Sequence, residues 1–417
     1  MAEQGAQQGQ APQGAEPELA AQQGRPSTRP EIQAMSAAVS AGDWPGRVTA
    51  VACRTCGSRR PVKASGVGWV SFYREGFLGD LPVQRRPASE MEGSGVRPAK
   101  GSGMRIAVLD DYQGVALEMA DWSPVLARAE VDVFTDHVRD VDALAERLAP
   151  HDVVVVMRER TPVPEALLER LPNLRLIVST GRRNAAVDVA AARARGIEVC
   201  GTPSLATAPA ELTWALVLGL ARHLPAEAAG VRAGGWQTTV GRDLHGRTLG
   251  ILGLGRIGTQ VAQVGVAFGM DVVAWSANLT DERAAEAGAR RVDLDTLLAG
   301  SDVVTLHLVL GERTQGLLGR RELALMKPDA LLVNTARAGL VDTHALVDAL
   351  AAGRLGGAGL DVFDEEPLPV DHPLRGEPRA LLTPHLGYVT EDVYRTFFAG
   401  VVEDILAFWG GTPLRPL

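Results

Sequence analysis

The chain has 417 residues, which is more than one hydrophobic core usually serves, so we expect at least two domains. The hydrophobic fraction is 46% and the charged fraction 22%, as in globular proteins. No apolar run approaches the roughly 18 residues that a membrane span needs, and the net charge of −8 gives nucleic-acid binding no electrostatic support. The N-terminus also lacks the basic and then apolar order of a secretory signal. We therefore predict a cytoplasmic protein that binds neither membrane nor nucleic acid.

The first 103 residues differ in composition from the rest. They carry 12 Lys and Arg against 9 Asp and Glu, are rich in Gln, Gly, Pro and Ala, and show no sustained helical or strand period. Such a segment cannot bury enough apolar surface to offset its chain entropy, so we expect a disordered or non-native extension. Cys53 and Cys56 form a CxxC pair here, but a structural zinc site needs four ligands, and we predict no metal.

From Met104 onward, short β-branched runs alternate with segments of helical period. Alternation of this kind is typical of parallel sheets with helices on both faces. One α/β sheet rarely holds this many strands, so we predict two doubly wound domains. The predicted strands are 105–109, 152–157, 174–179, 197–200, 248–252, 272–275, 303–306, 331–334 and 358–362, and helical patterns include 141–148, 164–170 and 344–352.

A glycine fingerprint follows the predicted strand 248–252. Gly253, Gly255 and Gly258 have the GxGxxG spacing and open a helix that runs to about Phe268. Glycine at these positions permits a tight turn, a close approach of backbone to a pyrophosphate, and close packing of helix on strand. The helix N-terminus adds free amides and a positive dipole end. The turn therefore predicts a dinucleotide cofactor.

The residue expected to contact the adenine ribose is not the usual acid. In the common pattern, an acidic residue about 20 positions after the glycines binds the ribose 2′-hydroxyl. Here Ser276 stands at the tip of the predicted second strand, and the nearest arginine is Arg283. A serine does not repel a 2′-phosphate, so NAD and NADP both remain open as the cofactor.

Several ordered motifs carry a resemblance to a known family. They are LHGRTLGILGLGRIG at 244–258, NTARAGLVD at 334–342, GLDVFDEEP at 359–367 and TPHLG at 383–387. On these motifs the chain resembles, from 104 to 417, the D-isomer-specific 2-hydroxyacid dehydrogenases. The resemblance implies a Rossmann-like cofactor domain, 204–385, inserted in a flavodoxin-like substrate domain, 104–203 completed by 386–417. Helices at 208–223 and near 391–409 would cross between the two, and we expect a homodimer.

Three residues in these motifs suit the reduction of a 2-oxo acid. The reaction needs a cation for the carboxylate, an acid for the developing alkoxide, and a group that keeps this acid charged. Arg337 offers a planar fork for a carboxylate, and His385 is the acid candidate because histidine is the side chain suited to proton transfer near neutral pH. Glu366 would favour the protonated form of His385 by hydrogen bonding. In isolation, Arg337 could equally be a surface salt bridge and His385 a core histidine.

The resemblance also implies contacts to the cofactor and the substrate. Arg256 and Ile257 would lie under the pyrophosphate, and Ala336 and His307 near the ribose and nicotinamide. Asp361 matches the aspartate that binds the nicotinamide carboxamide, although it could instead cap a turn. Gly181 lies in the turn whose amides would receive the substrate carboxylate. Charged and aromatic residues near these positions (Arg158, Arg182, Arg183 and Tyr388) could shape the substrate pocket or serve only as surface charges and packing.

We therefore predict an NAD(P)-dependent oxidoreductase that transfers a hydride between nicotinamide and C2 of a small D-2-hydroxy acid or 2-oxo acid, of the glyoxylate or hydroxypyruvate type. The alternative is a dinucleotide-sensing protein similar to a co-repressor, in which the cofactor controls partner binding and little turnover occurs. Fold alone does not separate the two.

Overall fold

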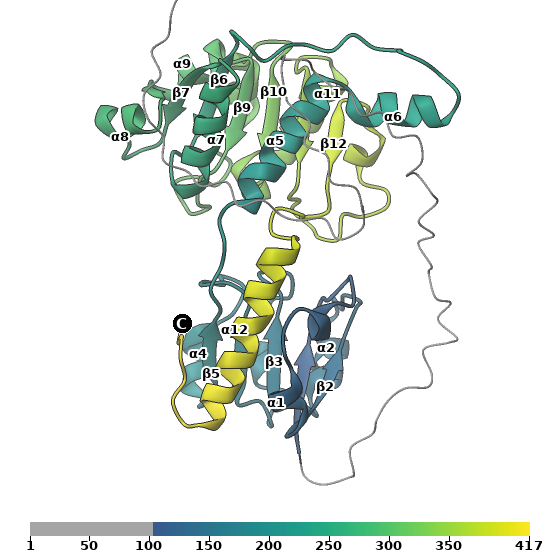
Figure 1. Cartoon of the computed structure of the whole chain (residues 1–417), viewed down its shortest axis with the longest axis vertical. Helices are drawn as coiled ribbons and strands as arrows, with labels where there is room; N and C mark the ends of the chain where they lie inside the picture. The colour runs from purple at the N-terminus through teal and green to yellow at the C-terminus, as the bar shows by residue number, and fades with distance from the viewer. Residues whose placement is uncertain (1–102) are drawn as a thin grey trace, which may run out of the picture. The chain divides into compact units, whose positions relative to one another are not determined.

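The computed structural model describes residues 103–417 (Figure 1). The CxxC pair and the extension, apart from Gly103, lie outside these residues. Two parallel sheets make up the described chain, one of five strands and one of seven. The predicted α/β class with two doubly wound sheets is confirmed. The domain boundaries near 203 and 385 stay predictions.

The first sheet has the strand order β2-β1-β3-β4-β5, with every pair parallel. This is the flavodoxin-like order, whose switch point lies between β1 and β3. Its strands are β1 (Met104–Val108), β2 (Ala129–Val133), β3 (Val153–Val156), β4 (Leu176–Ser179) and β5 (Glu198–Gly201).

Central strand β3 shows why this sheet needs helices on both faces. Its four valines are all buried. Val153 and Val155 belong to the core under α1 and α12, whereas Val154 and Val156 belong to the core under α2, α3 and α4. Successive side chains of a strand point to opposite faces, so an all-valine strand must be covered twice. The covering helices are α1 (Ser123–Leu126), α2 (Val141–Leu148), α3 (Glu165–Leu168), α4 (Val189–Ala194) and α12 (Glu391–Trp409).

The second sheet has the order β12-β11-β10-β9-β6-β7-β8, again with parallel pairs. The first strand of this sheet along the chain, β6, lies in its middle. Later strands are added first on the β7 side and then on the β9 side, so the strand order reverses between β6 and β9, as in Rossmann folds. Its strands are β6 (Thr248–Leu252), β7 (Asp271–Trp275), β8 (Arg290–Arg291), β9 (Val303–Leu306), β10 (Leu331–Asn334), β11 (Gly357–Leu360) and β12 (Ala380–Leu382).

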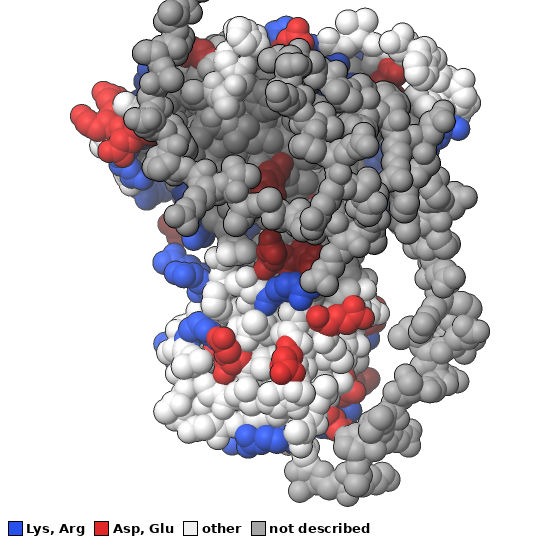
Figure 2. Space-filling view, viewed as in Figure 1, with Lys and Arg blue, Asp and Glu red and all other residues white. Residues whose placement is uncertain are grey.

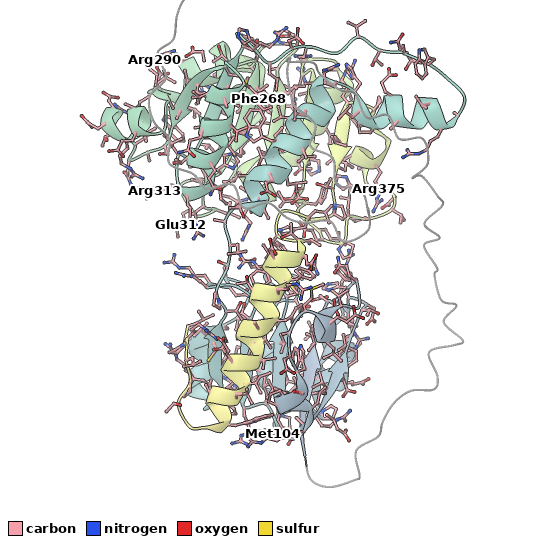
Figure 3. The ribbon with its side chains drawn as sticks, in the orientation of Figure 1. Met104, Phe268, Arg290, Glu312, Arg313 and Arg375 are labelled. Atoms are coloured by element: carbon pink, nitrogen blue, oxygen red, sulfur yellow. The ribbon has the colours of Figure 1, made fainter. Side chains whose placement is uncertain are left out.

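Helices also cover both faces of the second sheet. Helices α5 and α7 share one core, to which Trp214 of α5 belongs. At the edge of this core Trp214 packs on Phe268, which is labelled in Figure 3, with ring centroids 5.0 Å apart. Helices α9, α10 and α11 contribute to the opposite core. The helices are α5 (Ala208–Ala221), α6 (Leu224–Arg232), α7 (Arg256–Ala267), α8 (Asp281–Glu286), α9 (Leu294–Gly300), α10 (Arg320–Leu325) and α11 (Thr343–Ala351).

Helix α12 connects the end of the chain to its beginning. It follows the second sheet in sequence but packs on β4 and β5 of the first. Its N-terminus is capped by the Thr390 side chain, which accepts a hydrogen bond from the Val393 amide. Phe397, Phe398 and Ile405 of this helix are fully buried in the first core. The side chains on α12 thus complete a core whose other strands and helices precede it by more than 180 positions.

The predicted strands agree with the structure to within two residues at each end. Three strands were not predicted, namely β2, β8 and β12, and each lies at an edge of its sheet. An edge strand has one hydrogen-bonded neighbour and less burial, so it lacks the continuous apolar run of a central strand. Strand β8 consists of Arg290 and Arg291, both exposed.

The surface of the described chain mixes both signs of charge. On the face drawn in Figure 2, acidic and basic side chains are interspersed where the atoms are not grey. Arg195, for example, lies 3.2 Å from Glu165 and 2.9 Å from Glu169. Among residues 103–417, no helix has the length and apolar character to cross a membrane.

Candidate active site

The glycine turn lies at the switch point of the second sheet. Gly253 directly follows β6, and His307 directly follows β9, the neighbouring strand on the other side of the reversal. Gly253 has φ +100°, and a Cβ atom there would lie 2.8 Å from the His307 carbonyl oxygen. Only glycine fits this conformation and this contact. In open α/β sheets, ligands bind outside the carboxyl ends of the strands at this point.

The other two glycines fit a dinucleotide in different ways. A Cβ on Gly258 would clash with the Gly253 carbonyl oxygen, so this glycine lets helix α7 pack closely on the turn. A Cβ on Gly255 would meet no atom within 4 Å. Gly255 is the N-cap of α7 and, like Arg256 after it, is exposed, while Ile257 is half-buried. The open space at the amide-bearing end of α7 is where a pyrophosphate would be held.

His307 offers a second sign of fit. Its Nε2 atom is buried and has no hydrogen-bond partner among the described residues. Burial lowers the pKa of His307 to about 3, so the ring is neutral. Buried polar atoms are normally paired, so an orphan at the switch point suits a ribose hydroxyl or a nicotinamide amide. Ser276 follows β7 and is half-buried, at the predicted ribose position.

The structure brings His385 and Glu366 together. His385 Nδ1 lies 2.6 Å from Glu366 Oε2, and the other carboxylate oxygen accepts from the Phe363 amide at 2.9 Å. Burial raises the pKa of Glu366, but the hydrogen bond and charge of His385 outweigh it, and the net pKa is lowered. Glu366 is therefore an anion. Its carboxylate accepts a hydrogen bond from Nδ1–H of His385, which leaves Nε2 as the ring nitrogen available for proton transfer.

The three residues predicted to carry the chemistry follow neighbouring strands. Arg337 follows β10, Glu366 follows β11 and His385 follows β12, and these three strands are adjacent in the sheet. Parallel strands end at the same edge, which is why residues almost 50 positions apart converge. Asn334, only 2% exposed, holds the Arg337 turn by accepting from the Ala336 amide and donating to the Arg337 carbonyl.

Asp361 holds the turn that carries His385. It is fully buried, and its carboxylate accepts hydrogen bonds from the Thr383 hydroxyl at 2.7 Å and from the Leu386 and Gly387 amides at 2.6 and 2.8 Å. Burial raises the pKa of Asp361, although all these donors favour its ionised form. The turn-holding role is thus the one the contacts describe. The carboxamide role stays a prediction.

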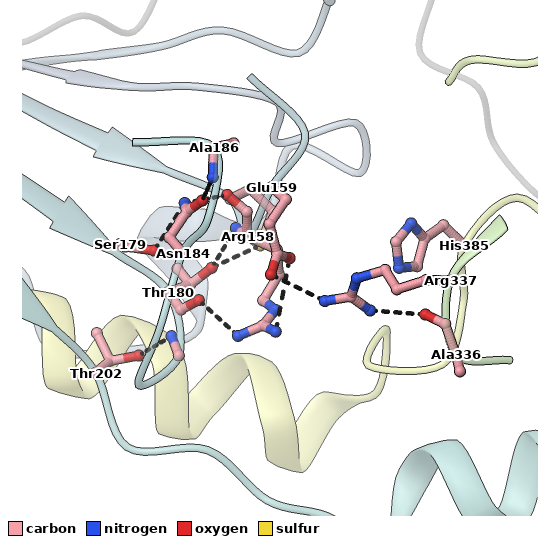
Figure 4. Close-up of polar contacts among 12 residues, drawn as sticks. Arg158, Glu159, Ser179, Thr180, Asn184, Ala186, Thr202, Ala336, Arg337 and His385 are labelled. Atoms are coloured by element: carbon pink, nitrogen blue, oxygen red, sulfur yellow. Dashed lines mark hydrogen bonds and ion pairs between the residues drawn. The ribbon is translucent and has the colours of Figure 1, made fainter. Parts of the chain in front are cut away.

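Arg337 is engaged in the described structure. Its Nη2 donates to Glu159 Oε1 at 2.9 Å, and its Nη1 donates to the Ala336 carbonyl at 2.7 Å (Figure 4). Glu159 Oε2 also lies 3.6 Å from Nη2 of Arg158. The Arg337 side chain is 37% exposed and that of Glu159 25%. The guanidinium predicted to bind a substrate carboxylate therefore already contacts a carboxylate of the protein.

The turn at Gly181 differs from the prediction in one detail. Gly181 has φ +96°, and its amide donates to the Thr202 hydroxyl at 2.7 Å. A Cβ atom there would clash with the Arg158 guanidinium, which lies over the turn. Arg182 and Arg183 are exposed. The Gly181 amide is therefore engaged within the protein, and the role of this turn in substrate binding stays a prediction.

A cleft of about 420 Å³ contains the three predicted catalytic side chains in its lining. Arg337, Glu366 and His385 line it from the second sheet, and Glu159 and Arg160 from the loop after β3 of the first. Its remaining lining is His137, Val138, Arg139, Val141, Leu144, Pro162, Pro164, Phe363, Asp364 and Glu365. The first sheet's own switch point thus faces the same cleft.

Arg160 and Tyr388 support the cleft wall. Arg160 donates to the Asp110 carbonyl at 2.7 Å and lies 4.5 Å from the Tyr112 ring centroid. Tyr388 is 9% exposed and packs in the core under α12, with its ring edge-on to His385 at 5.2 Å. Burial raises its pKa above the ordinary value. Of the two expectations for Tyr388, packing is what its contacts describe.

Sequence analysis missed Glu159, Arg160 and Asn334. A signal for the first two exists, because the charged run Arg158-Glu159-Arg160 follows immediately on a buried all-valine strand. Charges at the carboxyl end of a central strand in a doubly wound sheet point to a ligand site. No group of three His, Cys, Asp or Glu side chains in residues 103–417 is placed to hold a metal ion.

The comparisons with known proteins identify the family of this chain. The sequence model described as "D-isomer specific 2-hydroxyacid dehydrogenase, NAD binding domain" matches residues 214–387. A glyoxylate reductase of Thermococcus litoralis is 38% identical over 289 residues, which cover 67% of this chain and 84% of that protein. The chain belongs to the D-isomer-specific 2-hydroxyacid dehydrogenase family. The predicted resemblance is therefore confirmed, and an NAD(P) cofactor follows from membership.

Two further relatives define how far the likeness extends. A D-3-phosphoglycerate dehydrogenase of Bacillus subtilis is 36% identical over 313 residues, which cover 74% of this chain. The dehydrogenase described here spans only 58% of that protein's length. The crystal structure of a phosphoglycerate oxidoreductase from Vibrio cholerae is 41% identical with a TM-score of 0.71, and the match covers 74% of this chain and all of that one.

Proposed function

We propose that this dehydrogenase interconverts a small D-2-hydroxy acid and its 2-oxo acid. One observation carries the proposal. His385, held by Glu366 at 2.6 Å, and Arg337 line the same cleft, at the carboxyl edge of the second sheet, where β6 also runs into the glycine turn. An acid, its anionic partner and a carboxylate-binding cation are the groups that the reduction of a 2-oxo acid needs.

Each residue has a separate task in the proposed reaction. Arg337 binds the substrate carboxylate and orients C2. His385 donates a proton from Nε2 to the developing alkoxide in reduction and removes it in oxidation. Glu366 stabilises the imidazolium and fixes its ring orientation. Hydride transfer to or from C2 is the chemistry that a nicotinamide cofactor would supply when held at the second sheet.

The cofactor would be held mainly by backbone. The amides at the start of α7 would donate to the pyrophosphate at Gly255, and Arg256 and Ile257 would flank it. Ser276 leaves room for either NAD or NADP at the ribose. His307 and Ala336, each directly beyond a strand of this sheet edge, would lie near the nicotinamide riboside.

The substrate that we favour is of the glyoxylate or hydroxypyruvate type. The cleft of about 420 Å³ presents charged groups, among them Glu159, Arg160 and Arg337, beside apolar side chains such as Phe363. The Thermococcus litoralis relative named above is a glyoxylate reductase. A short polar oxo acid fits both facts.

The test is a screen for oxidation of NADH and NADPH by the full-length chain. The panel would be glyoxylate, hydroxypyruvate, pyruvate, 2-oxobutyrate and 3-phosphohydroxypyruvate, with chiral analysis of each product. We expect turnover of glyoxylate or hydroxypyruvate, and D-glycerate from the latter. Absence of turnover with all of these acids would contradict the proposal. The alternative of a dinucleotide-sensing protein has no observation in its favour.

We further propose that the protein is a cytoplasmic homodimer. Helix α6 has no buried residue, and Leu224 and Val231 on it are more than half exposed. Trp236 and Val240 in the following segment are 76% and 94% exposed. Several large apolar side chains exposed within 17 residues of chain support self-association. Light scattering would test it, with Trp236→Ser and Val240→Ser expected to shift the mass toward that of one chain.

A further inference from the structure

Glu159 holds the guanidinium that the proposed reaction needs. Its Oε1 accepts from Arg337 Nη2 at 2.9 Å, while Arg337 Nη1 is used by the Ala336 carbonyl (Figure 4). The contact links the loop after β3 of the first sheet to the loop after β10 of the second. A carboxylate on an arginine is the same pairing that a 2-oxo acid would make there.

The backbone directs Glu159 into this position. Arg158, the residue before it, has φ +53°, a left-handed conformation that is uncommon for a side chain of this size. Its amide donates to the Thr180 hydroxyl at 2.9 Å, and its carbonyl accepts from the Asn184 amide nitrogen at 2.6 Å. These contacts maintain the unusual conformation, so the placement of Glu159 is built into the loop.

Two carboxylates cannot share Arg337 without a cost in free energy. One guanidinium carries a single positive charge, and a second anion beside it would repel the first across a half-buried cleft. The substrate carboxylate therefore competes with Glu159 for this contact. A neutral isostere at position 159 would remove the competition.

We propose that Glu159 is an internal competitor of the substrate carboxylate and that substrate binding displaces it from Arg337. This inference rests on the proposed function. The displaced carboxylate has a second cation within reach, because Glu159 Oε2 already lies 3.6 Å from Arg158 Nη2. Arg158 stays in place over the Gly181 turn, where its Nη1 donates to the Thr180 carbonyl at 3.3 Å. Glu159 thus sets how tightly small oxo acids bind.

The test uses Glu159→Gln and Glu159→Ala in the full-length chain. We expect the KM for the 2-oxo acid to fall about three- to ten-fold, because the variants lack the partly exposed ion pair with Arg337 that competes with the substrate. The dissociation constant of oxamate, a small oxo-carboxylate used as a probe, should fall by a similar factor. The value of kcat should change less than KM. Glu169→Gln is the matched control, because Glu169 also pairs with an arginine, Arg195, at 2.9 Å but lies outside the cleft lining.

The outcomes separate this inference from the proposed function. Weaker or unchanged oxamate binding in both Glu159 variants would overturn the inference, even if turnover is normal, because it would mean that Glu159 only positions Arg337. Tighter oxamate binding would support it even if none of the tested oxo acids is reduced. A tightening of similar size in Glu169→Gln would also overturn it, since the effect would then follow from net charge alone.

Discussion

Replacing Gly255 by alanine tests the cofactor cradle without disturbing the fold. Gly255 is in an extended conformation with φ −90°, and a Cβ there meets no atom within 4 Å. The substitution should therefore leave the free energy of unfolding unchanged or raise it by about 0.4–1 kcal/mol. If the pyrophosphate approaches the backbone here, the added methyl occupies its place.

The loss of affinity can be estimated from the contacts at stake. A hydrogen bond from a backbone amide to a charged phosphate contributes about 1.5–3 kcal/mol. Loss of one such bond should raise the dissociation constant of NADH about ten-fold or more, since about 1.4 kcal/mol is a factor of ten. Fluorescence titration with NADH and thermal melting of the same samples provide the two readouts.

Gly258→Ala is the matched comparison on the same turn. Its Cβ would clash with the Gly253 carbonyl oxygen, so we expect a loss of stability of about 1–3 kcal/mol or more from overpacking. Stability and affinity should thus separate in Gly255→Ala and fall together in Gly258→Ala. Unchanged NADH affinity in a stable Gly255→Ala protein would refute the placement of the pyrophosphate.

Three further predictions concern the rest of the site. Asp361→Asn should lower the free energy of unfolding by about 2 kcal/mol. It should also speed hydrogen exchange at the Leu386 or Gly387 amide, because the Asn side chain has one acceptor oxygen and its nitrogen cannot accept from the second backbone N–H. A loss of NADH affinity with unchanged exchange would favour the carboxamide role instead. The pKa of Glu366 is lowered from 4.5, so its contribution to stability is complete above that pH and is lost as the pH falls further. Glu366→Gln should therefore flatten acid unfolding below pH 4.5, followed by circular dichroism, and should move the upper pH limit of oxo-acid reduction downward; an upward shift would contradict the role of Glu366. Ser276→Asp should weaken NADPH binding relative to NADH, and an unchanged ratio of the two dissociation constants would show that position 276 does not contact the ribose.

Central strands and the cofactor turn could be predicted because their sequence signals are local. The four valines of β3 and the Gly253-x-Gly255-x-x-Gly258 spacing each reflect one strand or one turn. The edge strands β2, β8 and β12 could not be predicted in this way, because exposed residues such as Arg290 and Arg291 form no apolar run. Burial on one side only is a property of the assembled sheet.

The candidate site, too, could be predicted only where its residues lie in local sequence motifs. Arg337, Glu366 and His385 lie in motifs, and their convergence follows from adjacent strands that end at one edge. The contact between Glu159 and Arg337 joins residues 178 positions apart on different sheets. Asp361 was assigned to the cofactor by resemblance, whereas its three donors all come from the 383–387 turn. Such contacts depend on tertiary structure that local patterns do not encode.

The central claim is that His385 moves the proton in the reduction of a 2-oxo acid. The most direct measurement compares wild-type and His385→Ala enzyme at saturating cofactor, with the best oxo acid from the substrate screen and with NADH affinity determined in parallel. We predict that kcat falls about 100-fold or more, on the scale of general acid catalysis, while the dissociation constant of NADH stays within about two-fold because the glycine turn is untouched. Near-normal turnover in His385→Ala would contradict the account.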